Sequence, residues 1–428
     1  MKTKMLQTVA LMGAGALALS ACGGSSDGGG GGGGGDSDTL TIAIQSWMGD
    51  KLGLNAMAKK FEEDHGVTVK LVEYADNDAL SNFALRWKTG SADQDMVVVD
   101  GASTAVQFLE QGLIIDFNET DLLSGDLAPD KFVGEALNYN QKDGVQFSIP
   151  IGLETYNISA NKTFFEEADL LESDGSMPVP ADWNELYDLA AALHEHTGKP
   201  GMTIQWGPNA GPTMFSVEQA LRGDLYKEDG VTLTFDTPEM REVLPIWKKG
   251  VDEGVFSIDT FTNKDAGRSN YNAGGLPMLL ETAAHVPEAA PDIGEENAVL
   301  MPMPGSLENG SFGFSAGIVI PKATENQDLA LQFIAEAVMT DLQIDPAMEW
   351  GKLPVLTEQF DKIDADWTTD MYETLKLSVP APMYPDLPRI QEQIKERLQQ
   401  YLTGNTEDPT EFLEGLQDMV DNANLGLD

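Results

Sequence analysis

The sequence contains a single cysteine, Cys22, among its 428 residues. One cysteine cannot form an intramolecular disulfide bond or supply a multi-cysteine zinc site. His194 and His196 lie two positions apart and would diverge on a helix, whereas a helical zinc pair needs a spacing of four. No Walker motif, calcium-binding loop or ordered Ser-His-Asp set occurs, so we expect neither a metal nor a cofactor.

Basic residues are also scarce. Lysine and arginine number 26 against 70 acidic residues, which gives a net charge of -44 at pH 7. Such a surface repels nucleic acids and anionic lipid headgroups, so neither is an expected partner. This balance is also typical of proteins from saline habitats, where salt screens the self-repulsion, although many exported proteins are simply acidic.

The only marked hydrophobic run near the N-terminus, Val9 to Leu19, is too short for a permanent membrane span. Lys2 and Lys4 precede it, as in a secretory signal peptide. The run leads into Leu19-Ser20-Ala21-Cys22, which resembles the bacterial lipobox, whose cysteine becomes the lipidated N-terminus. We therefore expect residues 1–22 to be a signal peptide and Cys22 to carry a lipid anchor at the outer face of the cell membrane.

Residues 23–38 are rich in glycine, with an unbroken run from Gly28 to Gly35. A phosphate-binding loop would follow a strand and end in Gly-Lys-Ser/Thr, and neither feature is present. The composition instead predicts a flexible tether between the anchor and a folded body.

The remaining chain is too long for one compact core and predicts two or three domains. Thr39 to Ile44 reads as a strand, and Leu54, Met57, Ala58 and Phe61 share one helical face. Met96 to Val99 is a continuous apolar run typical of a buried parallel strand. This alternation predicts an α/β fold with helices on both sides of an open sheet.

In open α/β sheets, ligands bind beyond the carboxyl ends of the strands. This rule selects Trp47, Asp50 and Lys51 after the first strand, and Asp100 after the buried strand. An aromatic residue is more often part of the core than of a site, which is the alternative for Trp47.

The segment from Gln146 to Asp169 contains an extended run with Pro150, followed by Glu154 and Tyr156. We interpret it as a crossover between two lobes, with Glu154 and Tyr156 facing the gap between them. The alternative is an edge strand with a solvent-facing glutamate, because proline cannot donate to a central ladder.

Three further candidates follow similar reasoning. Trp206 and Glu281 stand at the ends of predicted strands, and Tyr384 lies in a proline-rich loop. The full set of candidate ligand-binding residues is Trp47, Asp50, Lys51, Asp100, Glu154, Tyr156, Trp206, Glu281 and Tyr384.

In their order and spacing, several segments together resemble the extracellular solute-binding proteins of ABC importers, specifically the sugar-binding family that includes maltose-binding protein. They are FEEDHGVTVKL, DMVVVDGASTAVQFLEQGLIIDF, SIPIGLETYNISANKTFFEEADL, PADWNELYDLAAAL and SFGFSAGIVIPKA. Asp50 and Lys51 resemble a sugar-binding Asp and Lys of that family, and Glu154 resembles its Pro-Ile-x-x-Glu glutamate. A family tryptophan is missing from residues 281–284, and a family Asp-Arg pair falls on Ser103-Thr104, which argues against maltose itself but not against a carbohydrate.

The resemblance implies a two-lobed periplasmic-binding-protein fold (type II-like) that closes by a hinge near residues 152–156. It implies lobes of residues 39–152 plus 315–353 and of 156–312 plus 357–428. It further implies a monomer that captures a carbohydrate and delivers it to the transmembrane subunits of an ABC permease.

Two other functions remain open at this level. The same fold could bind a cationic solute such as a polyamine, because four candidate residues are acidic. A secreted glycosidase could use Glu154 and Glu281 as its two carboxyls, at a separation that the sequence does not give. Sugar hydroxyls need paired donors and acceptors, and sugar CH faces stack on aromatic rings, so the mixed set fits a sugar best.

Overall fold

A computed structural model describes residues 38–75, 78–207, 209–263, 265–404, 408–423 and 425, all within one compact unit. Cys22, the predicted signal peptide and nearly all of the predicted tether lie outside these residues. Within the described ranges, no helix is long and apolar enough to cross a membrane. The same ranges contain no group of three or more side chains placed to hold a metal ion.

The chain forms a nine-stranded mixed sheet in the order β2-β1-β3-β11-β6-β9-β7-β8, with β10 pairing with β6. Its strands are β1 (Thr39–Ile44), β2 (Thr68–Glu73), β3 (Met96–Val99), β6 (Ile149–Asn161), β7 (Met202–Ile204), β8 (Phe256–Ser257), β9 (Met278–Thr282), β10 (Ala298–Met301) and β11 (Gly313–Val319). A separate hairpin pairs β4 (Gln141–Lys142) with β5 (Val145–Gln146).

Helices cover both faces of the sheet, which confirms the predicted α/β fold. They are α1 (Met48–Lys51), α2 (Leu54–His65), α3 (Asp78–Trp87), α4 (Val106–Glu110), α5 (Lys162–Glu167), α6 (Trp183–Thr197), α7 (Ala210–Arg222), α8 (Pro238–Asp252), α9 (Ala266–Asn272), α10 (His285–Ile293), α11 (Ser306–Asn309), α12 (Gln327–Met339), α13 (Ile344–Trp350), α14 (Thr357–Phe360), α15 (Asp366–Leu377), α16 (Leu387–Thr403) and α17 (Pro409–Asp421).

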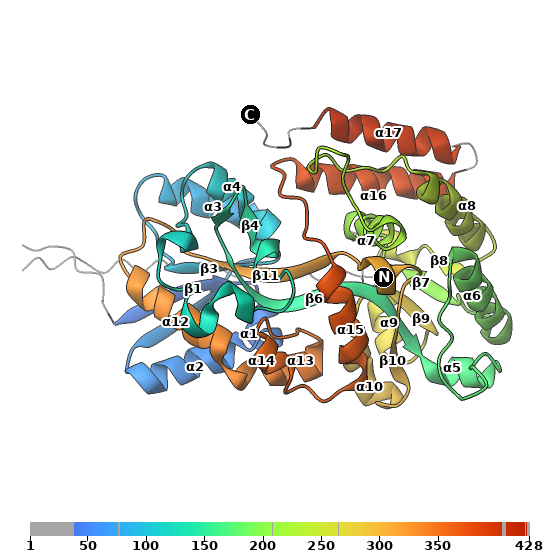
Figure 1. The fold of residues 1–428 in the computed structure, drawn as a ribbon, viewed down its shortest axis with the longest axis horizontal. Helices are drawn as coiled ribbons and strands as arrows, with labels where there is room; N and C mark the ends of the chain where they lie inside the picture. Colours follow the sequence, from blue (N-terminus) through green and yellow to red (C-terminus); the bar gives the residue numbers. More distant parts are fainter. Residues whose placement is uncertain are drawn as a thin grey trace, which may run out of the picture. The chain divides into compact units, whose positions relative to one another are not determined.

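Strand β6 joins two halves of the sheet. Its first part pairs with β11 from Ile149 to Thr155, and its second part pairs with β9 and β10 from Tyr156 to Asn161. We call β2, β1, β3, β11 and the start of β6 the first lobe, and the end of β6 with β7, β8, β9 and β10 the second lobe. Figure 1 shows β6 and β11 running from one lobe into the other.

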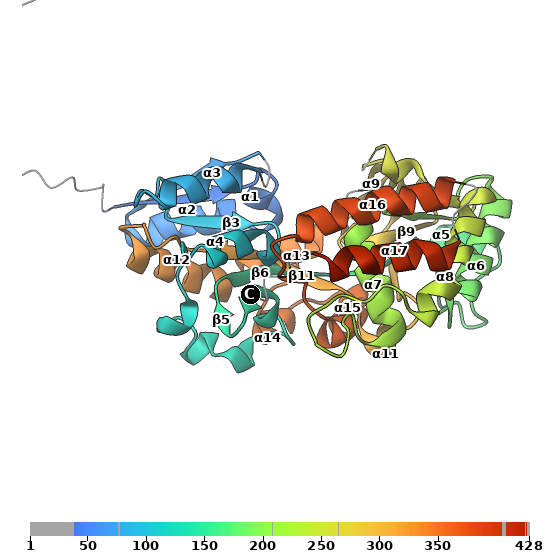
Figure 2. The same cartoon turned by 90° about the horizontal axis from the view of Figure 1, so that it is seen from above.

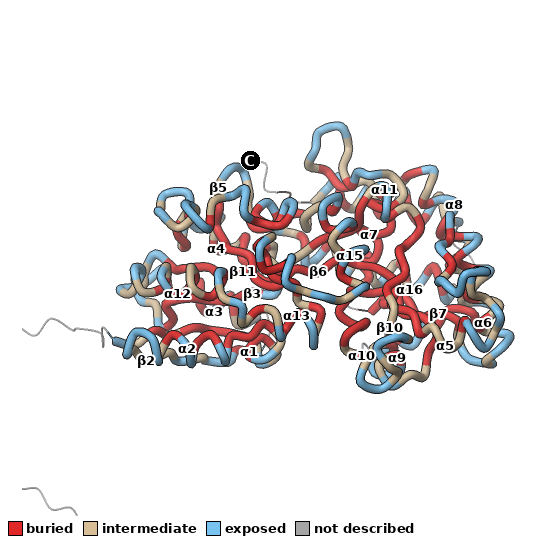
Figure 3. The backbone as a smooth tube through the Cα atoms, turned by 60° about the horizontal axis from the view of Figure 1, so that its bottom comes forward, coloured by how far each residue is buried: buried red, intermediate tan, exposed pale blue. Residues whose placement is uncertain are grey.

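The predicted crossover is confirmed, and the edge-strand alternative is wrong. Every residue of β6 is buried, as the continuous red of its tube in Figure 3 indicates. Pro150 fits within this strand because it pairs with Gly317 of β11 on one side, and the structure describes no strand on the other side of β6 at this point. A β-bulge follows two residues later. The register shifts between Ser315 and Ala316, which leaves Gly152 unpaired at φ +67°, a conformation that favours glycine.

Strand periodicity determines which side chains enter which core of the first lobe. Ile42, Met96 and Val98 join a hydrophobic cluster with Phe61 of α2 and Phe333 of α12. The alternate residues on these strands, including Val97, join a second cluster with α3 and α4. Each fully buried Val, Leu, Ile or Phe side chain contributes about 1.5–3 kcal/mol relative to exposure, so this alternation fixes the register.

In the second lobe, Ile158 of β6 and Leu280 of β9 pack in a large core with α6, α7, α8, α16 and α17. Helices α16 and α17 lie side by side over this lobe in Figure 2 and contact each other. Leu279 faces the other side of the sheet and packs against Tyr271 of α9.

The segment before the last two helices lies between the two cores. Phe360, Met371 and Leu375 belong to the hydrophobic cluster of Ile42 and Phe333, which also contains Leu300 of β10. Helix α15 contacts β6, β10 and α11. The chain then forms a bridge between Phe312 and Val379, and α16 packs in the second-lobe core. The exact lobe boundaries stay predictions.

Candidate functional site

The parallel strands of both lobes point their carboxyl ends at the middle of β6. In the first lobe, Val99 at the end of β3 pairs with Gly317 of β11. Three residues earlier on β11, Phe314 pairs with Glu154 of β6. In the second lobe, Thr282 at the end of β9 pairs with Tyr156. Residues 154–156 therefore lie between two sets of strand ends, the position where α/β sheets bind ligands.

Glu154 is buried at this position and forms an ion pair with Lys352. The two residues are cross-strand neighbours, because the backbones of Leu153 and Leu353 exchange hydrogen bonds of 2.7 and 3.1 Å. Burial raises the pKa of Glu154, and the charge of Lys352 opposes that rise. The Lys352 ammonium also lies 5.3 Å from the centre of the Trp47 ring, within the range of a cation–π contact.

Asp100 follows β3 directly and is exposed to solvent. It makes no hydrogen bond or ion pair with any residue that the structure describes. Although the residue keeps solvent-accessible surface, the protein around it limits hydration of the carboxylate and so raises the pKa of Asp100, while the charges of Lys352 and Arg268 oppose this rise. Asp100 thus presents an unoccupied acceptor near cations from both lobes.

Glu281, near the end of β9, has a side chain that is 1% exposed and is surrounded by donors. Arg268 of α9 donates from Nε to both carboxylate oxygens at 2.9 and 2.8 Å, and also from Nη2. Asn209 donates at 2.8 Å, and His285 Nε2 lies 3.1 Å away. Burial alone would raise the pKa of Glu281, but His285 and Arg268 outweigh it and lower the pKa to about 2.

His285 links Glu281 to a further ion pair. Its Nδ1 lies 3.3 Å from Glu288, which in turn binds Lys51 of the first lobe at 2.5 Å. Burial alone would lower the pKa of His285, but Glu281 and Glu288 raise it to about 9. The Lys51 ammonium also lies 4.3 Å from the centre of the Trp350 ring. At neutral pH His285 is therefore protonated between the two ionised carboxylates Glu281 and Glu288.

The structure brings five of the sequence-based candidates together around residues 154–156: Trp47, Asp100, Glu154, Tyr156 and Glu281. Trp47 is half-buried. Tyr156 is buried and packs against Phe312 and Phe314 at ring-centre distances of 6.1 and 6.2 Å. Burial and the charge of Glu281 raise the pKa of Tyr156 well above its usual value.

The other four candidates have their side chains committed elsewhere. Asp50 is exposed and accepts a hydrogen bond from Asn55, and Lys51 is paired as described above. Trp206 lies in the second-lobe core, where it contacts Trp247 and Phe261. Tyr384 is also buried in that core and donates to the Val231 carbonyl. These four residues stay predictions as ligand contacts.

Sequence reasoning missed the cations Lys352, Arg268 and His285, together with Asn209. No spacing pattern announces them, because each is positioned by a partner distant in sequence. The one signal in the sequence was the scarcity of basic residues. Because the chain has only 26 lysines and arginines, a basic residue near a predicted strand end is a stronger candidate for the site than its residue type alone suggests.

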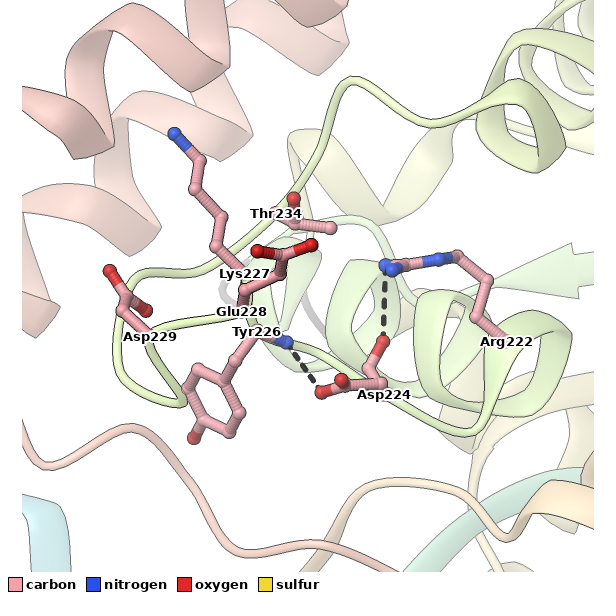
Figure 4. A pocket seen from close by; sticks show the side chains of 7 residues that line it. All are labelled: Arg222, Asp224, Tyr226, Lys227, Glu228, Asp229 and Thr234. Atoms are coloured by element: carbon pink, nitrogen blue, oxygen red, sulfur yellow. Dashed lines mark hydrogen bonds between the residues drawn. The ribbon is translucent and has the colours of Figure 1, made fainter.

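A surface pocket of about 550 Å³ lies away from these strand ends (Figure 4). Its lining comes from one segment of the second lobe: Arg222, Asp224, Tyr226, Lys227, Glu228, Asp229 and Thr234. Arg222 donates to the Asp224 carbonyl at 3.2 Å, so the segment is held by its own contacts. Two closing lobes could not enclose a pocket that is formed by one segment of a single lobe. The candidate solute site is therefore the region around residues 154–156.

Solved structures share this fold. The GacH receptor of Streptomyces glaucescens, solved unliganded and with acarbose, is 20% identical, with a TM-score of 0.75 over 89% of this chain and 97% of that one. A solute-binding protein of Thermotoga lettingae bound to α-D-tagatose gives 20% identity and a TM-score of 0.75 over 90% and 99%. The maltose-bound MalE3 of T. maritima gives 15% and 0.73 over the same shares. These likenesses confirm the two-lobed periplasmic-binding-protein fold.

No curated protein matches the sequence significantly. The family described as bacterial extracellular solute-binding protein does match, over residues 56–373. This range includes the crossover strand, Asp100, Glu154, Arg268 and Lys352. The chain belongs to the bacterial extracellular solute-binding protein family.

Proposed function

We propose that this protein captures a sugar or oligosaccharide between its two lobes outside the cytoplasm and delivers it to the membrane permease of an ABC transporter. One observation supports the proposal above all: two sets of strand ends meet at residues 154–156, where the exposed Asp100 is within electrostatic range of Lys352 of the first lobe and Arg268 of the second. The related structures described above contain acarbose, α-D-tagatose or maltose, which supports a carbohydrate as the ligand class.

The free hydrogen-bonding groups at this position suit hydroxyls. Asp100 can accept from a sugar hydroxyl, and Lys352 and Arg268 retain N–H donors beyond those given to Glu154 and Glu281. Trp47 adds an aromatic face for sugar CH groups. A hydroxyl both donates and accepts, so it can satisfy both kinds of group at once.

Capture would involve closure about the crossover. Gly152 sits in the β-bulge of β6, and the chain passes between lobes again along β11 and near Val379. Such short connections can act as hinges. A ligand held by groups of both lobes stabilises the closed state by its greater affinity for that state.

A sugar fits better than a polyamine. The acidic residues that suggested a cationic ligand are mostly neutralised internally: Glu154 by Lys352, Glu281 by Arg268 and His285, and Glu288 by Lys51 and His285. Of the acidic candidates around residues 154–156, only Asp100 is exposed and lacks an ion pair among the described residues. A ligand with several ammonium groups would therefore find one unpaired carboxylate there.

The protein family consists of binding proteins rather than enzymes, and the carboxylates agree with a binding role. A glycosidase general acid must hold a proton at the working pH. The pKa of Glu281 is lowered to about 2, which argues against Glu281 as that acid, and the protein donors on its oxygens leave it little freedom to act as nucleophile or base. Burial raises the pKa of Glu154, but Glu154 is paired with Lys352, which favours its ionised form.

Membership of an extracellular family puts the protein outside the cytoplasm. We propose further that Cys22 carries the lipid anchor, that residues 23–38 form the tether and that the protein acts as a monomer. Labelling cells with a fatty-acid analogue would test the anchor: Cys22→Ser should abolish labelling and release the protein into the medium.

Calorimetric titration of the protein without residues 1–22 tests the ligand class. We expect binding of at least one of maltose, acarbose and D-tagatose, with a raised melting temperature, no release of reducing ends and no response to spermidine. Asp100→Asn should weaken sugar binding about tenfold, because a charge-assisted acceptor is lost. The matched control Asp188→Asn changes an exposed carboxylate on α6, outside the set of candidate residues, and should leave affinity nearly unchanged. Binding of spermidine without any sugar would overturn the proposal.

A further inference from the structure

We propose that Arg268 is the ligand-binding residue of the second lobe and that Glu281, the residue selected from the sequence, is a positioning residue that holds it. This inference rests on the proposed function and assigns roles within the same site. It reverses the sequence-based expectation, in which the carboxylate touches the ligand.

Glu281 has little capacity left for a ligand. Its side chain is 1% exposed, and its two oxygens accept from Arg268 Nε and Nη2 and from Asn209, with His285 Nε2 at 3.1 Å. A carboxylate offers about four lone-pair sites, and these partners account for them. A solute hydroxyl would have to displace a charged donor to reach Glu281.

Arg268, by contrast, keeps donors available. Its side chain is 33% exposed, and the edge formed by Nε and Nη2 is used by Glu281. Among the residues that the structure describes, the remaining nitrogen, Nη1, has one distant ion pair of 3.9 Å to Asp265, whose side chain is 58% exposed. A guanidinium has a planar, fixed set of donors, so pairing along one edge orients the free Nη1 without further ordering cost.

The fold brings Arg268 to the strand ends by close packing of α9. A Cβ atom at Gly267 would lie 2.8 Å from Thr203 Cγ2 and 3.3 Å from both Leu279 Cδ1 and Thr260 Cγ2. Glycine therefore lets α9 approach β7 and β9 closely, and the next residue, Arg268, reaches Glu281 at the end of β9. Its charge also acts on Asp100 and Tyr156, which supports a position facing the first lobe.

The arrangement predicts the chemistry of the contact. Arg268 donates from the second lobe to an oxygen of the ligand, while Asp100 accepts from a hydroxyl of the ligand in the first lobe. His285 and Asn209 hold Glu281 in place and do not need to touch the ligand. A sugar with hydroxyls on both sides of its ring satisfies both lobes at once.

The test uses calorimetric titration with maltose, acarbose and D-tagatose against Arg268→Met, Glu281→Gln and the double variant. The double variant removes both charges, so it avoids a buried unpaired carboxylate that could prevent folding. We expect affinity to fall at least tenfold in all three. Because Glu281 acts through Arg268, the double variant should bind no more weakly than Arg268→Met alone. Additive losses would show an independent role for Glu281 and overturn its assignment.

Arg222→Met is the matched control. Arg222 pairs with Glu218 at 2.9 Å, and the two side chains are 24% and 1% exposed, much like Arg268 and Glu281. This variant should lose stability but keep its affinity. Guanidinium chloride at low millimolar concentration should partly restore binding to Arg268→Ala, an effect that a purely structural arginine would not give.

The outcomes separate the two proposals. A wild-type protein that binds none of the three sugars contradicts the proposed function, and with it this inference. A wild-type protein that binds a sugar, with Arg268→Met/Glu281→Gln binding it equally well, overturns this inference alone.

Discussion

Asp100 and Glu281 are both carboxylates at the carboxyl ends of strands, one in each lobe, yet their surroundings differ completely. Asp100 is exposed and makes no ion pair or hydrogen bond within the described part of the chain. Glu281 is 1% exposed and is enclosed by Arg268, His285 and Asn209. The two sites therefore use the same side-chain chemistry for different purposes.

The difference shows that position at a strand end does not by itself assign a role. A carboxylate without partners is available to a solute, whereas one with several charged donors organises those donors. Glu154 lies between the two cases, because it is buried but has Lys352 as its one ion-pair partner. The number of protein partners is thus a better guide than the residue type.

Replacing Glu281 should give the largest effect on stability. Glu281→Ala leaves Arg268 and His285 without their shared counterion in a buried setting, and removing one partner of such a pair costs about 3–5 kcal/mol. Chemical denaturation should show this loss in the free energy of unfolding. A loss below about 1 kcal/mol would mean that Glu281, like Asp100, is structurally dispensable, and the comparison would fail.

The pH dependence of stability tests the same network through His285. Its pKa is raised from 6.5 to about 9, so the folded state retains a proton that the unfolded state loses. This contribution is complete below pH 6.5 and is lost as the pH rises to about 9, by about 3 kcal/mol at 1.36 kcal/mol per pKa unit. Unfolding measured from pH 6 to 10 should show the decline.

The variant His285→Gln is the control for this alkaline limb, because glutamine does not titrate and the decline should disappear. In the wild type the pKa values of Glu281 and Glu288 are lowered to about 2, so their contribution is present above about pH 4.5 and is lost as the pH falls to 2. In His285→Gln this acid limb should shrink but persist, because Arg268 still lowers the pKa of Glu281 and Lys51 that of Glu288. An unchanged alkaline slope in His285→Gln would assign that slope to another group.

The position of the crossover between Asp100 and Glu281 also depends on the β-bulge at Gly152 of β6. Gly152 has φ +67°, and a Cβ atom there would lie 2.5 Å from Leu52 Cδ2. Gly66 has nearly the same φ, +69°, with nothing within 4 Å. We expect Gly152→Ala to cost about 2 kcal/mol and Gly66→Ala about 1 kcal/mol, because only the former adds a clash to the backbone strain. Equal losses would mean that Leu52 moves aside freely.

Local patterns in the sequence were enough to predict the fold class and several of its strands and helices. The strand pattern of Thr39 to Ile44, the continuous apolar run of Met96 to Val99 and the helical face of Leu54, Met57 and Phe61 correctly predicted β1, β3 and α2, because these depend on local patterns. The start of α6 is also determined locally, because Asp182 caps it by accepting from the Asn184 and Glu185 backbones. The rule for strand ends also led to Asp100.

The partners at the site could not be read in the same way. Arg268 is thirteen positions from Glu281, and Lys352 is 198 positions from Glu154, so only the folded chain brings them together. Trp206 and Tyr384 show the opposite error. Both stand where a ligand platform is plausible, but burying a large ring in a core is strongly favourable, and each side chain turns inward.

The smallest expected effect on stability belongs to Asp100, the other half of the comparison. Asp100→Asn removes a charge without breaking any ion pair or hydrogen bond to a described residue, so the free energy of unfolding should change by no more than about 0.5 kcal/mol. Chemical denaturation beside Glu281→Gln makes the contrast direct, because both changes convert a carboxylate to an amide of the same shape. A stability loss in Asp100→Asn as large as that in Glu281→Gln would mean that Asp100 is also held by the protein, and it would remove the distinction between a carboxylate that binds and one that positions.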